Sequence, residues 1–400
     1  GTGTPYDPYQ IRTPQQMNEI GIYREDWDKH FRLMADIDLR GYQGASFNII
    51  ASRDGRAGFT GVFDGNGHTI SNFSYICHDS AWLGPVGLFG VVCCGEARIH
   101  NLGLIDPTIE IHTERELTVG LLVGELSSSG AVSSCYVEGA TITGSHITAG
   151  GLVGYNTGTI ADCHSGGTVA GKDGVGGIVG INTGTLTDCY STATVDGNDW
   201  VGGLVGTAQE ATTIKGCHSA GTVTGHSLVG GLAGFSEGPV TDCNSTSTVT
   251  GTDYFTGGLL GGVIESGTVE DCYSNGVVVG KNVVGGLVGS NYGNLVRCYS
   301  AATVDGNDWV GGFVGEAREA TAITDCHSVG TVRGRRHVGG LAGYNNGSVT
   351  DCNSTGAVTG DDYVGGLVGR SGTDGSVSNS GYSGTVTGDT DVGGLVGENF

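Results

Sequence analysis

Cysteine is the first residue type in this chain that recurs at a spacing suited to chemistry. Nine cysteines follow one another at intervals of 26 to 29 residues: Cys135, Cys163, Cys189, Cys217, Cys243, Cys272, Cys298, Cys326 and Cys352. Ser380 takes the next position in this row. If successive repeats stack about 4.8 Å apart, neighbouring cysteines lie within the Cα distance that a disulfide allows. An inward cysteine also serves as a small hydrophobic residue, so free stacked thiols and disulfides between neighbouring repeats are both open.

Aspartate recurs in the same register and offers oxygen ligands. One acidic cluster lies shortly before a Gly-rich block and includes Asp196, Asp199, Asp305 and Asp308. Because carboxylate oxygens are preferred ligands of Ca²⁺, these four are candidate calcium ligands, and calcium is the one cofactor that the sequence suggests. A further aspartate precedes most of the cysteines, where an Asx turn that satisfies local backbone donors is the alternative to metal binding.

Aromatic residues form a third set, two residues before each Gly-rich block. Trp200, Phe255, Trp309 and Tyr363 occupy every second repeat, which places them about 9.6 Å apart if repeats stack at about 4.8 Å. The next residue is usually valine and should face inward, so the aromatic side chains should face outward as one exposed stripe. Such a row is suited to stacking on sugar rings or on another protein. The alternative is that Gly corners reset the alternation and the aromatic side chains are core.

The element that must position these residues is a block of the form Val-Gly-Gly-Leu-Val-Gly. Its first glycine recurs every 26 to 28 residues, at Gly150, Gly176, Gly202, Gly230, Gly257, Gly285, Gly311, Gly339, Gly365 and Gly393. Self-similarity at a fixed period of this size is typical of solenoids. Short β-rich runs separated by glycine turns, with no helical period between them, predict that each repeat is one β coil.

The Gly-Gly-Leu-Val-Gly blocks, separated by Asp-Cys-Tyr-Ser strands, resemble the GLUG repeat over roughly residues 119–400. This resemblance implies a β-solenoid of the kind found in bacterial secreted and surface proteins, including immunoglobulin A peptidases and filamentous-haemagglutinin-like adhesins. It implies no catalytic residue. The peptidases in that group rely on a separate zinc domain with a His-Glu-x-x-His motif, and residues 112–116 are the nearest string here without matching it.

The predicted fold is therefore all-β, a parallel β-helix (β-solenoid) with a short N-terminal helical cap. Thr13-Pro14-Gln15-Gln16 is a good helix start, with Thr as N-cap and Pro at the first helical position. We expect residues 1–118 to form this cap and irregular first coils. We expect residues 119–400 to form the regular repeats, in one continuous solenoid.

Composition limits the partners of the chain. A formal net charge of −23 makes nucleic acid and anionic membrane surfaces poor partners. No apolar run approaches the roughly 18 residues of a transmembrane helix, so we expect no membrane insertion. The start of the chain is not a signal peptide and resembles a mature or trimmed end. We expect a secreted or cell-surface protein.

The repeats contain a larger duplication, because residues 189–297 and 298–400 are near copies offset by 109 residues. Duplication lengthens a rod, whereas an active site usually needs unique residues. We therefore favour a non-enzymatic structural or adhesive rod, with the glycan-binding adhesin and the polysaccharide-active lyase or hydrolase as alternatives. The only basic cluster, residues 333–337, is where an active site would be sought. Because the chain stops directly after a Gly block, head-to-tail self-association into a filament is a further expectation; surface or matrix polysaccharide is the other candidate partner.

Overall fold

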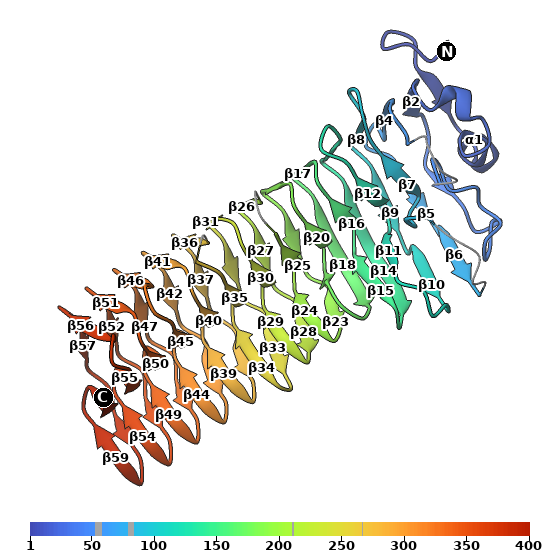
Figure 1. The fold of residues 1–400 in the computed structure, drawn as a ribbon. Coiled ribbons are helices and arrows are strands. Elements are labelled where there is room, and N and C mark those ends of the chain that lie inside the picture. The colour runs from blue at the N-terminus through green and yellow to red at the C-terminus, as the bar shows by residue number, and fades with distance from the viewer. Residues whose placement is uncertain (53–57, 79–83, 210–211, 266) are drawn as a thin grey trace. The chain divides into compact units, whose positions relative to one another are not determined.

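A computed structural model describes residues 1–52, 58–78, 84–209, 212–265 and 267–400. The chain forms two compact units, Gly1–Asp196 and Gly197–Phe400. Each unit is a stack of β coils whose named strands pair in parallel, which confirms the predicted β-solenoid (Figure 1). The predicted division at residues 118 and 119 and the predicted continuity of the repeats stay predictions.

The first unit begins with the predicted helical cap. Helix α1 spans Pro14–Ile20 and starts at the N-cap Thr13, whose side chain accepts a hydrogen bond from the Gln16 N–H. The Gln16 side chain accepts in turn from the Arg12 N–H at 2.8 Å, so two donors at the helix start are satisfied. Met17 and Ile20 are buried, and a 3₁₀ turn, η1 (Arg24–Asp26), follows.

The coils of the first unit are irregular before they become regular. One ladder of parallel strands shows this progression, because the segments between β2, β4, β8 and β13 are longer than those between its last members. It comprises β1 (Tyr9–Ile11), β2 (His30–Leu33), β4 (Val62–Asp64), β8 (Arg98–His100), β13 (Ala131–Ser133), β17 (Thr159–Ala161) and β21 (Thr185–Thr187). Large aromatic side chains fill this end, and Phe59, Phe63 and Phe89 are fully buried.

A coil of the second unit is built from five short strands joined by tight turns. The coil that starts after Cys298 contains β42 (Tyr299–Ser300), β43 (Thr303–Asp305), β44 (Asp308–Gly311), β45 (Val314–Ala317) and β46 (Ala322–Thr324). Each of these strands pairs in parallel with its equivalent in the next coil, for example Val304 with Val332 and Val310 with Val338. Equivalent positions therefore form columns.

Two neighbouring ladders of the second unit carry the residues discussed below. The first comprises β24 (Asp199–Gly202), β29 (Ser227–Gly230), β34 (Tyr254–Gly257), β39 (Asn282–Gly285), β44, β49 (Arg336–Gly339), β54 (Asp362–Gly365) and β59 (Thr390–Gly393). The second comprises β25 (Val205–Ala208), β30 (Ala233–Ser236), β35 (Leu260–Val263), β40 (Val288–Asn291), β45, β50 (Ala342–Asn345), β55 (Val368–Ser371) and β60 (Val396–Asn399).

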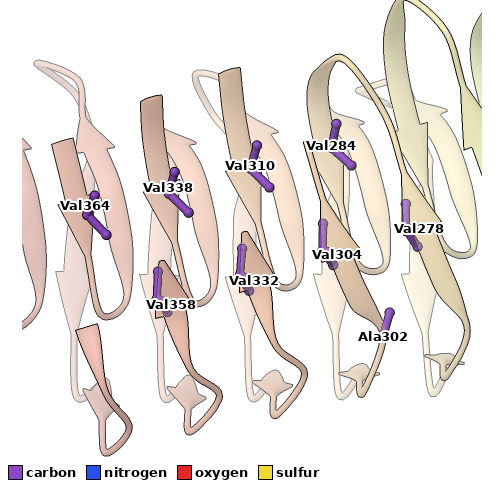
Figure 2. Close-up of a cluster of buried hydrophobic side chains, with 9 residues drawn as sticks. All are labelled: Val278, Val284, Ala302, Val304, Val310, Val332, Val338, Val358 and Val364. Atoms are coloured by element: carbon purple, nitrogen blue, oxygen red, sulfur yellow. The ribbon is translucent and has the colours of Figure 1, made fainter. Parts of the chain in front are cut away.

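The core of the second unit is made of small branched side chains. A cluster of eight valines and one alanine is fully buried, drawn in Figure 2 as residues 278, 284, 302, 304, 310, 332, 338, 358 and 364. Burying a valine contributes roughly 1.5–3 kcal/mol relative to exposing it, so a valine column stabilises each coil against the next. β-branched side chains also suit the extended backbone of a strand.

The paired glycines of each block are required by close approach of the backbone. A Cβ atom on Gly311 would overlap the carbonyl oxygen of Val314, and one on Gly312 would overlap the carbonyl oxygen of Gly340. No residue with a side chain fits at either position. This explains why the block repeats so faithfully in the sequence.

Candidate ligand-binding columns

The predicted aromatic stripe is a column of residues with left-handed backbone. In the second unit its members have φ between 51° and 63°: Trp200, Leu228, Phe255, Val283, Trp309, His337, Tyr363 and Asp391. These residues are left out of the pairing between coils: Asp199 pairs with Ser227 and Val201 pairs with Val229, with Trp200 omitted between them. The column therefore bulges out of the strand. We call it the aromatic column.

The column places the four predicted residues at the surface, although to different extents. Trp200 is 41% exposed, while Phe255, Trp309 and Tyr363 are half-buried. Val283, also in this column, is buried. The side chains therefore do not form the uniformly exposed stripe expected from the sequence, because neighbouring side chains cover part of the three half-buried rings. Ligand binding by these four residues stays a prediction.

A second column lies on the next ladder and packs against the first. It contains the third residue of each of these strands, and we call it the companion column: Thr207, Phe235, Gly262, Ser290, Glu316, Tyr344, Arg370 and Glu398. The Trp309 ring stacks on the Tyr344 ring of the next coil, with centroids 5.3 Å apart and planes 19° apart. Sequence reasoning missed this column, although the variable residue directly after the last glycine of each Gly block marks it.

Trp309 lies in the most elaborate part of the two columns. The Arg318 guanidinium lies over the Trp309 ring at 5.8 Å and over the Tyr292 ring at 5.7 Å. Beneath it, the carboxylate of Glu316 is fully buried and forms an ion pair with Arg318 at 2.7 Å. The Ser290 hydroxyl donates a hydrogen bond to the other Glu316 oxygen at 2.6 Å. Burying a carboxylate is costly unless it is paired and hydrogen-bonded, and both conditions hold here.

His337 continues this cluster along the aromatic column. Its ring stacks on Tyr363, with centroids 4.9 Å apart and planes 7° apart, and meets Trp309 edge-on at 6.5 Å. Its Nδ1 is buried and has no hydrogen-bond partner among the described residues. Burial lowers the pKa of His337 because the charged imidazolium is desolvated. The side chain is thus held as a neutral aromatic group.

The predicted acidic and basic residues are largely paired with one another. Asp308 contacts Arg336 at 3.3 Å, and Asp199 contacts His226 at 3.5 Å. Asp305 and Asp196 are exposed on their strands. Among the residues that the structure describes, no three His, Cys, Asp or Glu side chains are grouped so that they could hold a metal ion. Calcium binding at these aspartates remains an untested prediction.

The basic cluster at residues 333–337 lies beside aspartates of the two neighbouring coils. Arg333 lies in register with Asp305, and Arg336 lies in register with Asp308 on one side and Asp362 on the other. Opposite charges directly across neighbouring strands stabilise a sheet. This arrangement gives the cluster a structural role as a charge-paired ladder.

The cysteine column lies inside, as expected, and all twelve cysteines are free thiols, nine of them in the column and buried. Each thiol in the column contacts the carbonyl two residues earlier, as Cys326 does with Thr324 at 3.2 Å. It also accepts from the N–H of the previous coil, as Cys326 does from Cys298 at 3.4 Å. Ser380 makes the same two bonds, donating to Ser378 and accepting from the Cys352 N–H. The column is therefore a hydrogen-bonded ladder.

An aromatic ladder follows directly after the cysteines and was not singled out as a site from the sequence. In the first unit, Tyr136, His164 and Tyr190 stack with centroids 4.5–5.0 Å apart and nearly parallel planes. In the second unit, Tyr273 pairs with Tyr299 and both are exposed. The succession of Cys-Tyr and Cys-His dipeptides is the sequence signal for it. Because each stacked ring covers the face of the next, this ladder presents the edges of its rings to solvent.

Comparison with known proteins supports the repeat assignment. The GLUG motif matches residues 145–170, 173–196 and 334–359. The resemblance predicted from the sequence is thereby confirmed, and the chain carries GLUG repeats.

Two curated relatives share part of the repeat region. Over 159 residues the chain is 36% identical to halomucin of Haloquadratum walsbyi, covering 38% of this chain and 2% of that protein. Over 142 residues it is 34% identical to a provisionally named Gly-rich membrane protein of Evansella cellulosilytica, covering 34% of this chain and 15% of that protein. The chain thus spans a small part of either relative.

A solved structure was also found. It is the crystal structure of a protein from Bacteroides ovatus provisionally assigned as an immunoglobulin A1 protease. The sequences are 22% identical, with 82% of this chain and 77% of that chain covered at a TM-score of 0.38. In the described part of this chain, no helix is long and apolar enough to cross a membrane.

Proposed function

We propose that this chain is a non-enzymatic, adhesive β-solenoid of the cell surface or the secreted space, and that its aromatic column binds polysaccharide. The surface location is supported by the names of the two relatives, halomucin and a Gly-rich membrane protein. Binding is supported by the geometry of the column itself.

The observation that carries the proposal is the backbone conformation of the aromatic column. A left-handed backbone costs a residue with a side chain roughly 1–2 kcal/mol, and glycine avoids this cost. In the first unit the equivalent position before Gly176 is Gly174, with φ of 66°. The second unit places a side chain at all eight positions, although the chain has 78 glycines. Strained backbone of this kind is concentrated at functional sites.

The chemistry of the column favours a sugar polymer as the occupant. Trp200 is the most exposed of the four aromatic residues, and its ring makes no contact with another ring in the described part of the chain. An unoccupied indole face can stack on the apolar face of a sugar ring. A net charge of −23 opposes binding of polyanions, so the proposed ligand is a neutral polysaccharide.

The test uses Trp200→Gly, which copies the residue found naturally at position 174. Affinity gel electrophoresis with soluble xylan, mannan and hydroxyethyl cellulose, together with a glycan array, measures retention. Loss of retention on a polysaccharide that retains the parent chain is the expected result. The free energy of unfolding should change by no more than about 1 kcal/mol, because relief of the backbone offsets the lost ring contacts.

The matched control is Tyr273→Ala, because Tyr273 is 43% exposed on another ladder of the same unit. Its retention should equal that of the parent chain. If neither the parent chain nor any variant binds any polysaccharide, the adhesive proposal is wrong and a purely structural rod is the better description. Head-to-tail self-association stays a separate prediction, which light scattering from micromolar to millimolar concentration tests.

A further inference from the structure

The two near copies, residues 189–297 and 298–400, differ in the side chains around their tryptophans. The strand Cys189–Trp200 returns almost unchanged as Cys298–Trp309. Just beyond each tryptophan, the two columns diverge. In the order of the chain, the columns differ at Thr207 and Glu316, Leu228 and His337, and Phe235 and Tyr344, among other differences, and two residues beyond the first pair Gln209 is replaced by Arg318. One scaffold therefore carries two different surfaces, and each serves as an internal control for the other.

The surface around Trp200 is apolar and open. Leu228 and Phe235 approach one another over Gly262, where an added Cβ would lie 2.9 Å from Leu228 and 3.3 Å from Phe235. No charged residue takes part in this contact. The surface offers hydrocarbon and an exposed indole, which suits stacking.

The surface around Trp309 presents hydrogen-bond donors instead. Tyr292, Arg318, Trp309 and Tyr344 form a series of planar groups, with the guanidinium lying over the Tyr292 and Trp309 rings. The Arg318 side chain is 38% exposed, so part of its fork of N–H donors is open to solvent. Its Nε is buried and has no hydrogen-bond partner among the described residues.

The pair formed by the buried Glu316 and the partly exposed Arg318 is not required by the fold. The first copy builds the same coil with Thr207 and Gln209. Replacing a buried ion pair with uncharged residues is often neutral or stabilising, so stability does not explain why the second copy has the pair. What the pair achieves is position: Glu316, itself fixed by Ser290, holds the guanidinium over the Trp309 ring.

We propose that the surface around Trp309 is a hydrogen-bonding subsite that recognises the hydroxyl groups of a neutral sugar, with Arg318 as the donor and Glu316 as its positioning residue. This inference rests on the proposed binding of polysaccharide by the aromatic column. The subsite takes an uncharged ligand because Arg318 is neutralised by Glu316 and Arg336 by Asp308. The surface around Trp200 supplies stacking, and the surface around Trp309 supplies selectivity between sugars.

The test restores the residues of the first copy in the double variant Glu316→Thr with Arg318→Gln. Affinity electrophoresis compares the parent chain and the variant on xylan, mannan, hydroxyethyl cellulose and the polyanion pectate. We expect the variant to lose about tenfold in affinity for the preferred neutral polysaccharide, the worth of a hydrogen bond to a charged group. The differences in its affinity among the neutral polysaccharides should become smaller, while its melting temperature stays unchanged.

A second variant, Arg318→Gln with Glu316→Gln, removes both charges but keeps side chains of similar size, and it should show the same loss. Unchanged affinity and unchanged preference in both double variants, with Trp200→Gly still abolishing retention, overturns the subsite but leaves the proposed function standing. Stronger binding to pectate than to any neutral polysaccharide in the parent chain also overturns it. Retention that survives Trp200→Gly as well contradicts the proposed function itself.

Discussion

At the scale of single residues, the pair of Glu316 and Arg318 shows how a buried charge depends on one partner. The Glu316 carboxylate has no exposed surface, and its contacts are the Arg318 guanidinium and the Ser290 hydroxyl. Removing one member of such a pair leaves an uncompensated charge in the interior, whereas removing both does not. The two kinds of variant should therefore differ sharply.

We predict that Arg318→Gln alone lowers the free energy of unfolding by at least about 1 kcal/mol, because Glu316 is left buried without its counter-ion. The double variant with Glu316→Thr should be restored to within about 1 kcal/mol of the parent chain. Urea unfolding followed by circular dichroism measures both. Equal stability of the single and double variants would contradict this account of the pair.

His337 predicts a pH dependence at the same scale. Burial lowers its pKa, Arg370 and Arg336 act in the same direction, and Asp308 and Asp362 oppose them. The unfolded chain therefore takes up the proton first as the pH falls below the ordinary histidine value of about 6.5. Stability supplied by the neutral ring is complete above that pH and is lost as the pH falls toward the lowered pKa.

We expect His337→Leu, which copies Leu228 of the first copy, to reduce this dependence. Between pH 7.5 and pH 5, the melting temperature of the parent chain should fall by more than that of the variant. Differential scanning calorimetry at the two pH values makes the comparison. An identical fall in both proteins would show that His337 is not the group responsible.

At the scale of elements, the cysteine column joins coils through hydrogen bonds in which a hydroxyl oxygen can replace the thiol sulfur. Ser380 makes the bonds that the cysteines make, so the geometry accepts a hydroxyl. We predict that Cys326→Ser changes the free energy of unfolding by less than about 1.5 kcal/mol. Cys326→Ala should cost about 1–3 kcal/mol, because the Cys298 N–H loses its buried acceptor. Chemical denaturation of the two variants measures both changes in the free energy of unfolding.

The column also predicts where the chain reacts with alkylating agents. Hydrogen bonds along the column shift the thiol pKa in opposite directions: the bond with Cys135, together with burial, raises the pKa of Cys163, whereas bonds with neighbouring thiols lower the pKa of Cys243, Cys298 and Cys352. All nine thiols of the column are buried, so a reagent should not reach them in the folded chain. Iodoacetamide should modify the exposed Cys94 in the native protein and the column only after unfolding, as peptide mass spectrometry would show. Rapid labelling of the native column would mean that the coils open locally.

Much of this element structure was predictable from the sequence, and the reasons are local. The period of the Gly block fixes the coil, because backbone contacts at Gly311 and Gly312 admit no side chain. The helix start at Thr13 was readable for the same reason, since its capping partners are three residues away. The companion column and the buried Glu316 were not predictable, because they depend on which side chains the neighbouring coils bring beside them.

The aromatic column lies between these cases. Outward placement of Trp200 was predicted from inward placement of the following valine, and the described exposure agrees. Its cause was not anticipated, since alternation alone does not reveal that the residue has a left-handed backbone. Burial of Val283 in the same column depends on its neighbours and carries no sequence signal.

At the scale of the whole molecule, the duplication predicts that the chain tolerates a large deletion. Joining Asp188 directly to Cys298 removes residues 189–297. The sequence that follows the junction, residues 298–305, differs from residues 189–196 only at Ala301 in place of Thr192. In a solenoid each repeat contacts only its neighbours, so matched neighbours preserve the fold. We expect the shortened chain to unfold cooperatively with an unchanged circular dichroism spectrum per residue; aggregation or loss of strand signal would contradict this.

The ladders described for the second unit also determine how it resists being pulled. Its backbone hydrogen bonds join each coil to the next, as from the Leu287 N–H to Phe313 and from the Phe313 N–H to Leu341. A force that separates the ends of this unit therefore loads the bonds between one pair of coils at a time. Each coil that detaches frees 26 to 28 residues, or about 90 Å of extended chain. A stack of coils built in this way lengthens by one coil at a time while the remaining coils stay folded.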